Sequence, residues 1–302
     1  VDFDIIALDE AQKIKSPSTL VTIAAKALKG TFKIAMTGTP VENTLLDLWC
    51  IMDFCVPDLL GNAKSFAAKY QNSLRKEDTD IVALGNEIHD RMGIYFMRRL
   101  KKDAVRDLPE KHELKQKIEM PPVQSDTYKR VVEDYNSGIQ PNMLLTIMGI
   151  REVSEHPYLY NYTLSQHDMQ ELVESSARLQ ATIVVLDSIK EKNEKAIVFA
   201  ERKETQKMLW RVCKERYGIV AKIINGDTPS IVKRQTPNRL SRQSSINEFQ
   251  KADGFNVIIM SPVAAGMGLN VTAANHVIHY SRHWNPAKEN QATDRAYRIG
   301  QE

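Results

Sequence analysis

The chain has 302 residues, of which 42% are hydrophobic and 26% are charged, and a formal net charge of +3. So small a positive charge is compatible with nucleic-acid binding but does not argue for it. The three cysteines include no C-x-x-C pair, which argues against a zinc site or a disulfide framework and favours a reducing cytosolic or nuclear compartment. No apolar run approaches the roughly 20 residues of a membrane helix, so we expect no membrane partner.

Short apolar runs alternate with amphipathic stretches, which is typical of parallel sheets covered by helices. The apolar runs show little alternation, as expected for strands that are buried on both faces. We predict strands at residues 3–8, 32–36, 195–199, 220–224, 257–260 and 277–279. We predict helices at residues 17–28, 45–54, 80–97, 123–136, 177–192, 203–217, 241–250 and 286–297.

The middle of the chain differs in character from both ends. Residues 57–172 have a mostly helical pattern interrupted by prolines, with one strand expected at 113–119. Within it we expect residues 143–148 to form helix core. The chain therefore divides into a front α/β part at 1–108, a helical part at 109–174 and a back α/β part at 175–302.

Two adjacent carboxylates, Asp9 and Glu10, directly follow the first predicted strand. Side chains at the carboxyl end of a parallel strand point into the crevice where such sheets bind ligands. One carboxylate can hold Mg²⁺ on nucleotide phosphates while the other orients or deprotonates an attacking water. An Asp-Glu pair after a strand is also common in solvated loops, which is the alternative interpretation.

A second motif, Thr37-Gly38-Thr39-Pro40, follows the next predicted strand. Small hydroxyl residues around a glycine let the backbone approach a phosphate-bearing site and relay its state. A plain strand-to-helix turn that ends in proline is the alternative.

Two further motifs lie near the end of the chain. Gly266 and Gly268 follow the strand at 257–260, and their backbone N–H groups are free to bind a nucleotide or DNA phosphate. Arg295 and Arg298 lie on the last predicted helix and share a face at i, i+3. Paired guanidiniums can stabilise charge in a phosphoryl-transfer transition state, although a solvated basic face has the same pattern.

The order of these motifs resembles helicase superfamily two. Asp-Glu-Ala-Gln at 9–12 comes first, then Thr-Gly-Thr-Pro, then Gly-Met-Gly-Leu-Asn at 266–270, then Gln-x-x-Asp-Arg-x-x-Arg at 291–298. The segments at 37–49, 96–101, 108–111 and 270–301 are similar to its Swi/Snf-type, chromatin-remodelling branch. The resemblance covers essentially the whole chain.

The resemblance implies two RecA-like lobes that clamp ATP and step along duplex DNA. Residues 1–108 would be an incomplete first lobe, 109–174 a helical inter-lobe segment and 175–302 a complete second lobe. Asp9 would then hold Mg²⁺ and Glu10 would be the catalytic carboxylate. Arg295 and Arg298 would be arginine fingers from the second lobe.

The same resemblance assigns the remaining candidate residues. Gln291 and Gly268 would contact nucleotide, together with Gln12, which stands where many relatives have histidine. Thr37 would bind at the nucleotide site and, with Thr39, couple hydrolysis to lobe movement. The residues expected to face the phosphate backbone of double-stranded DNA, or to couple to it, are Ser261, Gly266, Asn270 and Trp284. Binding through phosphates would be salt-sensitive and poor in sequence specificity.

The sequence contains no G-x-x-x-x-G-K-[ST] phosphate loop. We therefore expect a piece of a longer, DNA-dependent ATPase, inactive alone, which remodels a DNA-bound protein complex. Two alternatives remain: a non-hydrolysing DNA-binding or scaffolding module, and a strand-separating helicase. Gln12 favours a bacterial source, for which we expect a cytoplasmic, nucleoid-associated protein; a eukaryotic one would be nuclear.

Overall fold

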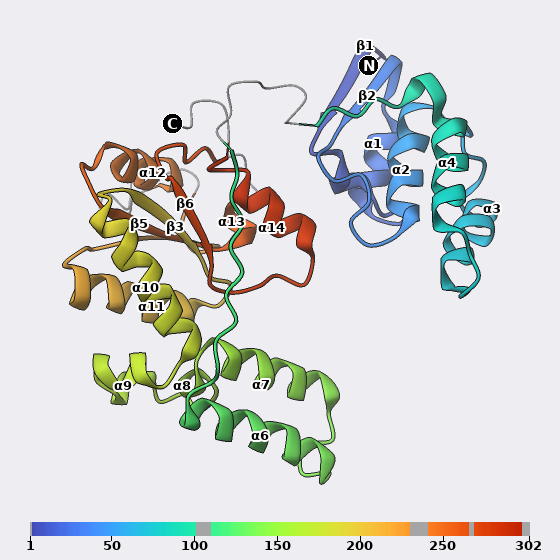
Figure 1. The fold of residues 1–302 in the computed structure, drawn as a ribbon. Helices are drawn as coiled ribbons and strands as arrows, with labels where there is room; N and C mark the ends of the chain where they lie inside the picture. The colour runs from blue at the N-terminus through green and yellow to red at the C-terminus, as the bar shows by residue number, and fades with distance from the viewer. Residues whose placement is uncertain (1, 101–109, 230–240, 266–268, 298–302) are drawn as a thin grey trace. The chain divides into compact units, whose positions relative to one another are not determined.

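The computed structural model describes residues 2–100, 110–229, 241–265 and 269–297 (Figure 1). The chain forms two compact units, Val1–Ala104 and Val105–Glu302. Among the described residues, no helix combines the length and the apolar character that crossing a membrane requires.

The first unit is built on two parallel strands. β1 (Asp2–Asp9) pairs with β2 (Lys29–Met36), and Asp9 lies opposite Met36 at their carboxyl ends. The 3₁₀ helix η1 (Ala11–Ile14) and α1 (Leu20–Ala27) form the crossover between them. The motifs that follow β1 and β2 consequently emerge from the same edge of the sheet.

The expectation that these two strands are buried on both faces is wrong for the described residues. In β1 only Ile6 is buried, where it packs with Ile14 and Phe54. Ile5 and Phe32, which pair in register, are 62% and 59% exposed. The reason is that the helices of this unit cover one face of the sheet and leave the other face bare.

α2 (Leu45–Cys55) is apolar around its circumference because it lies between the sheet and the outer helices. α4 (Ile81–Met92) is capped by Asp80, and it ends earlier than the sequence predicted because Gly93 takes a positive φ of 48°. The other helical turns of this unit are α3 (Ala63–Phe66), the π-helical η2 (Ala67–Gln71), η3 (Ser73–Arg75) and η4 (Gly93–Tyr95).

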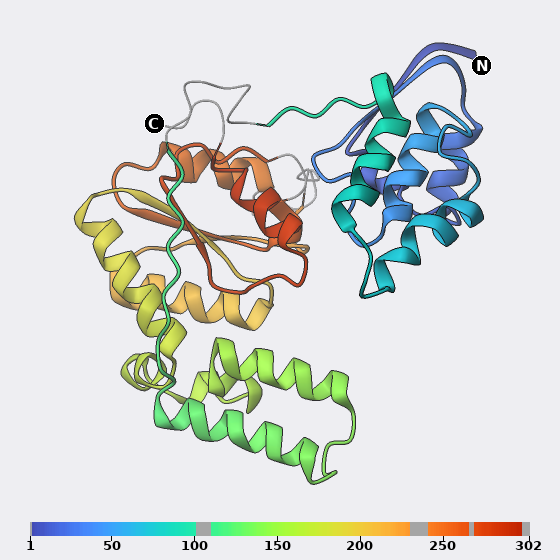
Figure 2. The ribbon, with the colours of Figure 1, turned by 45° about the vertical axis from the view of Figure 1, so that its right-hand side comes forward.

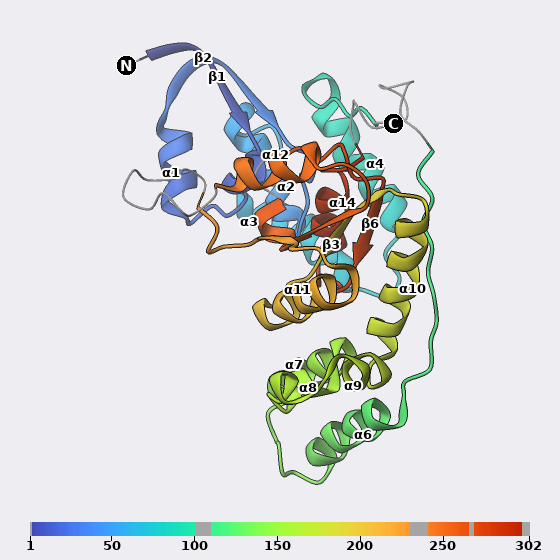
Figure 3. The ribbon, with the colours of Figure 1, turned by 90° about the vertical axis from the view of Figure 1, so that its left-hand side faces the viewer.

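The second unit contains a four-stranded parallel sheet in the order β4-β5-β3-β6. Its two faces bury alternate residues, with Ala196 and Val198 on one and Ile197 and Phe199 on the other. Figure 3 shows β3 and β6 side by side in this sheet. The strands are β3 (Lys195–Phe199), β4 (Lys222–Ile224), β5 (Asn256–Met260) and β6 (His276–His279).

Helices cover both faces of this sheet, as the sequence predicted. The first face packs against α10 (Ala177–Glu191) and α11 (Lys203–Tyr217). The second packs against α12 (Arg242–Lys251) and α14 (Pro286–Thr293), beside the short helix α13 (Pro262–Ala265).

The helical segment extends from this sheet, and its two longest helices lie side by side in Figures 1 and 2. The strand predicted at 113–119 is wrong, because residues 110–121 form no strand or helix and run as an exposed extended segment toward α6. Without a neighbouring strand, a β-favouring run has no ladder to join. The helices are α6 (Pro122–Asn136), α7 (Met143–Glu155), α8 (Pro157–Tyr160), η5 (Leu164–Gln166) and α9 (Met169–Glu174).

The expectation that residues 143–148 are helix core is also wrong. Met143 and Met148 are 62% and 44% exposed. The packed face of α7 instead contains Gly149, where an added Cβ would lie 3.0 Å from a ring carbon of Tyr160. The buried face of α7 is thus the one on which Tyr160 approaches Gly149 closely, and not the face of the apolar run at 143–148.

Candidate ATPase and DNA-contact residues

The carboxylate pair lies where β1 ends. Asp9 is exposed, and its Oδ1 accepts a hydrogen bond of 2.9 Å from the backbone N–H of Glu10. Glu10 is half-buried and has the left-handed conformation, with φ 52° and ψ 49°. This conformation costs a non-glycine residue about 1–2 kcal/mol and is often found at functional sites. It produces the sharp turn from β1 into η1.

A chain of side-chain hydrogen bonds connects the two front motifs. Gln12 Nε2 donates to Glu10 Oε2 at 2.6 Å, and Thr37 Oγ1 donates to Gln12 Oε1 at 2.6 Å. The backbone N–H of Thr39 donates to Thr37 Oγ1 at 3.1 Å. Both ends of the Gln12 amide are therefore used, and this one side chain connects the Thr37 hydroxyl to the Glu10 carboxylate.

The loop after Thr39 is held by residues that the sequence analysis missed. Thr39 Oγ1 lies 3.5 Å from Glu42 Oε1, and Glu42 forms an ion pair with Lys15 of the segment after η1. The buried carboxylate of Asp47 accepts backbone N–H bonds from Glu42 (3.0 Å) and Asn43 (2.8 Å). The signal for Asp47 was its position three residues after Thr44, in a capping-box arrangement at the start of α2.

In the second unit, candidate residues lie after β5 and along α14. Ser261 is 9% exposed, and its Oγ accepts a bond of 3.2 Å from the backbone N–H of Ala264. Asn270 is exposed, and Gln291 is half-buried on α14. Gly266, Gly268 and Arg298 lie outside the described residues.

Arg295 is buried, but it does not lie on a helix. α14 ends at Thr293, and Arg295 occupies the following turn, where its carbonyl accepts a bond of 3.0 Å from Val271 N–H. The prediction of a helix through 297, and of a shared helical face for the two arginines, is therefore wrong at Arg295. The helix ends where the chain turns and the Arg295 carbonyl binds Val271, a residue distant in sequence.

Trp284 lies in the loop between β6 and α14 and is 68% exposed. The guanidinium of Arg151, from α7, lies 5.1 Å from the centroid of its ring. Sequence reasoning missed Arg151, because 133 positions separate the two residues and no local pattern joins them.

A family model of the SNF2-related domain matches residues 1–196, the greater part of the chain. The chain belongs to the SNF2-related family. A second model, the helicase conserved C-terminal domain, matches residues 177–300. In this family member, the carboxylate and threonine motifs lie within the first match and the Arg295 motif within the second.

Several relatives are similar along nearly the whole chain. The Zorya protein ZorD of Escherichia coli is 39% identical over 99% of this chain and 28% of its own length. The putative ATP-dependent helicase/translocase YwqA of Bacillus subtilis is 36% identical over 100% of this chain and 32% of its own. The chain thus spans less than a third of the length of these relatives.

Solved structures of the SNF2-related family support the fold. A Sulfolobus solfataricus SWI2/SNF2 ATPase core in complex with dsDNA has a TM-score of 0.51 and 30% identity, over 99% of this chain and 61% of that one. The predicted α/β fold, with RecA-like parallel sheets covered by helices, is confirmed by this similarity.

His156 and His283 of this SNF2-related chain make the hydrogen bonds of structural histidines, as predicted. His156 is fully buried; its Nδ1 accepts from Tyr158 N–H and its Nε2 lies 2.8 Å from Leu172 O. Burial lowers the pKa of His156 to about 4. His283 Nδ1 accepts a bond of 2.9 Å from Asn285 N–H. Within the described ranges, no cluster of three or more His, Cys, Asp or Glu side chains could hold a metal ion.

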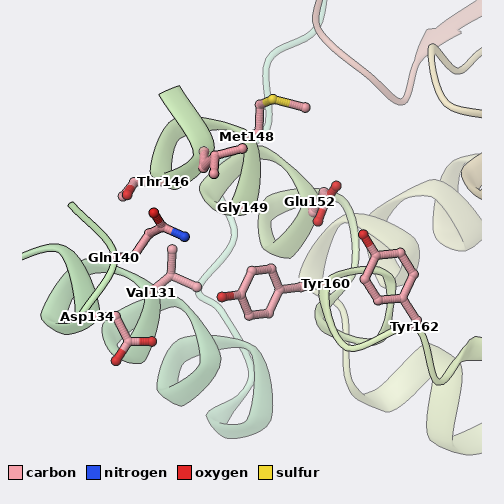
Figure 4. Close-up of a pocket in the computed structure, with 10 residues that line it drawn as sticks. Val131, Asp134, Gln140, Thr146, Met148, Gly149, Glu152, Tyr160 and Tyr162 are labelled. Atoms are coloured by element: carbon pink, nitrogen blue, oxygen red, sulfur yellow. The ribbon is translucent and has the colours of Figure 1, made fainter. Parts of the chain in front are cut away.

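A pocket of about 230 Å³ lies in the helical segment (Figure 4). Figure 4 shows Val131 of α6, Gly149 and Glu152 of α7 and Tyr160 of α8 around it. None of the candidate site residues in the described part of the chain lines this pocket. It therefore contributes nothing to the assignment of the ATPase residues.

Proposed function

We propose that this chain is part of an ATP-dependent double-stranded-DNA translocase of the SNF2-related family, which remodels a DNA-bound protein complex. Residues 1–108 would be the end of the first lobe, 109–174 the inter-lobe segment and 175–302 the second lobe. The observation that carries the proposal is the hydrogen-bonded chain from Glu10 through Gln12 to Thr37. These hydrogen bonds join the carboxylate that would activate the attacking water to the threonine motif that would respond to the nucleotide phosphate.

The residues at the end of β1 fit ATP and Mg²⁺. Asp9 has an exposed carboxylate, and Mg²⁺ prefers oxygen ligands and is bound through one or two carboxylates plus phosphates. When bound, Mg²⁺ would neutralise charge on the phosphate oxygens. Asp9 would hold it through its exposed carboxylate.

Glu10 would orient the attacking water and accept its proton. Gln12 donates to the carboxylate oxygen Oε2 and so fixes the orientation of the Glu10 side chain. Thr37 and Thr39 would respond to the phosphate and pass its state to the loop held by Asp47 and therefore to α2. Gln12 would also reach the nucleotide.

Residues of the second unit would complete the reaction. Arg295 and Arg298 would donate hydrogen bonds to the phosphoryl group as its charge develops, which is the arginine-finger role. Gln291 and Gly268 would contact the nucleotide. The residues proposed to face the DNA backbone are Ser261, Gly266, Asn270 and Trp284. The solved relative in complex with dsDNA supports this partner.

The test uses the full-length protein that contains this chain. DNA-stimulated ATPase activity should fall at least about a hundredfold in Glu10→Gln, because a general base typically contributes 10²–10⁴-fold, while ATP binding persists. Glu77→Gln, at an exposed position before α4 in the same unit, is the matched control and should retain activity. Hydrolysis independent of DNA, or full activity of Glu10→Gln, would refute the proposal.

The chain of 302 residues contains no phosphate-loop motif, and we propose that it hydrolyses no ATP by itself. The alternative is a non-hydrolysing DNA-binding or scaffolding module, for which Arg298→Ala in the full-length protein should have no effect. A strand-displacement assay separates translocation from strand-separating helicase activity: a translocase moves along the duplex without releasing a labelled strand.

A further inference from the structure

Trp284 exposes most of a large apolar ring to solvent in the loop after β6. Tryptophan is concentrated at binding surfaces, where a rigid ring supplies contact area. A ring whose orientation is fixed before the partner arrives binds more tightly, because ordering it on binding costs affinity.

The backbone around Trp284 is fixed by its own loop and by α14. The buried carboxylate of Glu289 accepts from Arg282 Nε at 2.8 Å and from His283 N–H at 2.7 Å. Asn285 caps α14 through a bond of 2.9 Å from Ala287 N–H. These bonds hold the main chain on both sides of Trp284, but they do not hold its indole ring.

Arg151 supplies the contact to the ring. Its guanidinium carbon lies 5.1 Å from the centroid of the Trp284 ring, within the range of cation–π attraction. The same group donates to the carbonyl of Arg282 at 3.2 Å and forms an ion pair with Glu201, in the loop after β3. The guanidinium is therefore held by two oxygen acceptors while it lies within cation–π range of the ring.

We propose that Arg151 is a positioning residue for Trp284 and holds the indole ready for duplex DNA. The inference rests on the proposed function for its DNA partner. It assigns a task to the helical segment: the last turns of α7 complete the DNA-facing loop of the second lobe. A guanidinium can stack behind an aromatic ring and also satisfy two oxygen acceptors, whereas a lysine ammonium cannot stack as a plane.

A neighbouring ion pair provides a matched control. Arg202 pairs with Glu152, one residue along from Glu201 and Arg151 on the same two segments. Loss of that pair disturbs the same junction between α7 and the β3–α11 loop, without the contact to Trp284. A general structural effect would therefore be equal in the Arg202 and Arg151 variants.

The experiment uses the 302-residue chain with Trp49 and Trp210 replaced by phenylalanine, so that Trp284 is the remaining tryptophan. Time-resolved fluorescence anisotropy should show faster local motion of the indole in Arg151→Met, and Arg151→Lys should restore little of the order. The Arg202→Met variant should resemble the parent. Equal indole motion in Arg151→Met and the parent, or an equal change in Arg202→Met, would overturn the inference.

DNA affinity is measured separately, with a fluorescein-labelled duplex of mixed sequence. Arg151→Met should weaken binding about two- to fivefold, the range that corresponds to a cation–π contact at an exposed site, and Trp284→Ala should weaken it at least as much. Unchanged affinity in Trp284→Ala would refute the DNA role in the proposed function. Unchanged affinity in Arg151→Met alone would refute positioning for DNA, so the two failures are distinguishable.

Discussion

Acid should destabilise the second unit through His156. The side chain is fully buried, and burial lowers its pKa from an ordinary value of 6.5 to about 4. The Nε2–H tautomer donates to Leu172 O while Nδ1 accepts from Tyr158 N–H, so the folded protein holds the neutral ring. A second proton would occupy the nitrogen that caps α8.

The direction of the change in stability with pH follows from proton binding to His156 in the folded and unfolded chains. Below pH 6.5 the unfolded chain takes up a proton on His156, whereas the folded chain does not until about pH 4. Stability is therefore complete above about pH 6.5 and is lost as the pH falls toward about pH 4. The difference between these two pKa values corresponds to about 3 kcal/mol of unfolding free energy. About 2 kcal/mol of this stability is lost between about pH 7 and about pH 5.

Urea unfolding of the second unit measures this loss, with Trp210 as the reporter in a Trp49→Phe, Trp284→Phe background. His156→Asn keeps an N-cap acceptor but removes the titrating ring, so it should lower stability at neutral pH and flatten the pH dependence by about 2 kcal/mol. His112→Asn, at an exposed position, is the control. An unflattened pH profile in His156→Asn would refute the reasoning.

Three other perturbations have defined outcomes. Asp47→Ala should lower the stability of the first unit by about 1–3 kcal/mol, because buried backbone N–H groups lose their acceptor; urea unfolding followed by Trp49 fluorescence measures it. Cys213 should resist iodoacetamide until the chain unfolds, since burial raises its pKa to about 12; rapid labelling in the native state, seen by mass spectrometry, would contradict this. Residues 105–302 should unfold cooperatively alone, whereas 1–104 alone should show weaker hydrogen-exchange protection than 105–302, because one face of its sheet is bare.

The sequence alone determined the second sheet well. Continuous apolar runs at 195–199 and 257–260 became β3 and β5 within a residue, because a strand buried on both faces must be apolar throughout. The same rule placed β1 and β2 but was wrong about their burial, since burial depends on what covers a strand. The run at 113–119 had strand-forming residues and found no neighbour to pair with.

The candidate site divides in the same way. The sequence determined which reactive side chains the chain contains, because the carboxylate, threonine and arginine motifs are short runs that can be recognised without the fold. The parallel pairing of β1 with β2 brought Gln12 to Thr37, and the docking of α7 brought Arg151 to Trp284. Side-chain contacts between segments distant in sequence depend on how whole elements pack, and only the tertiary structure decided them.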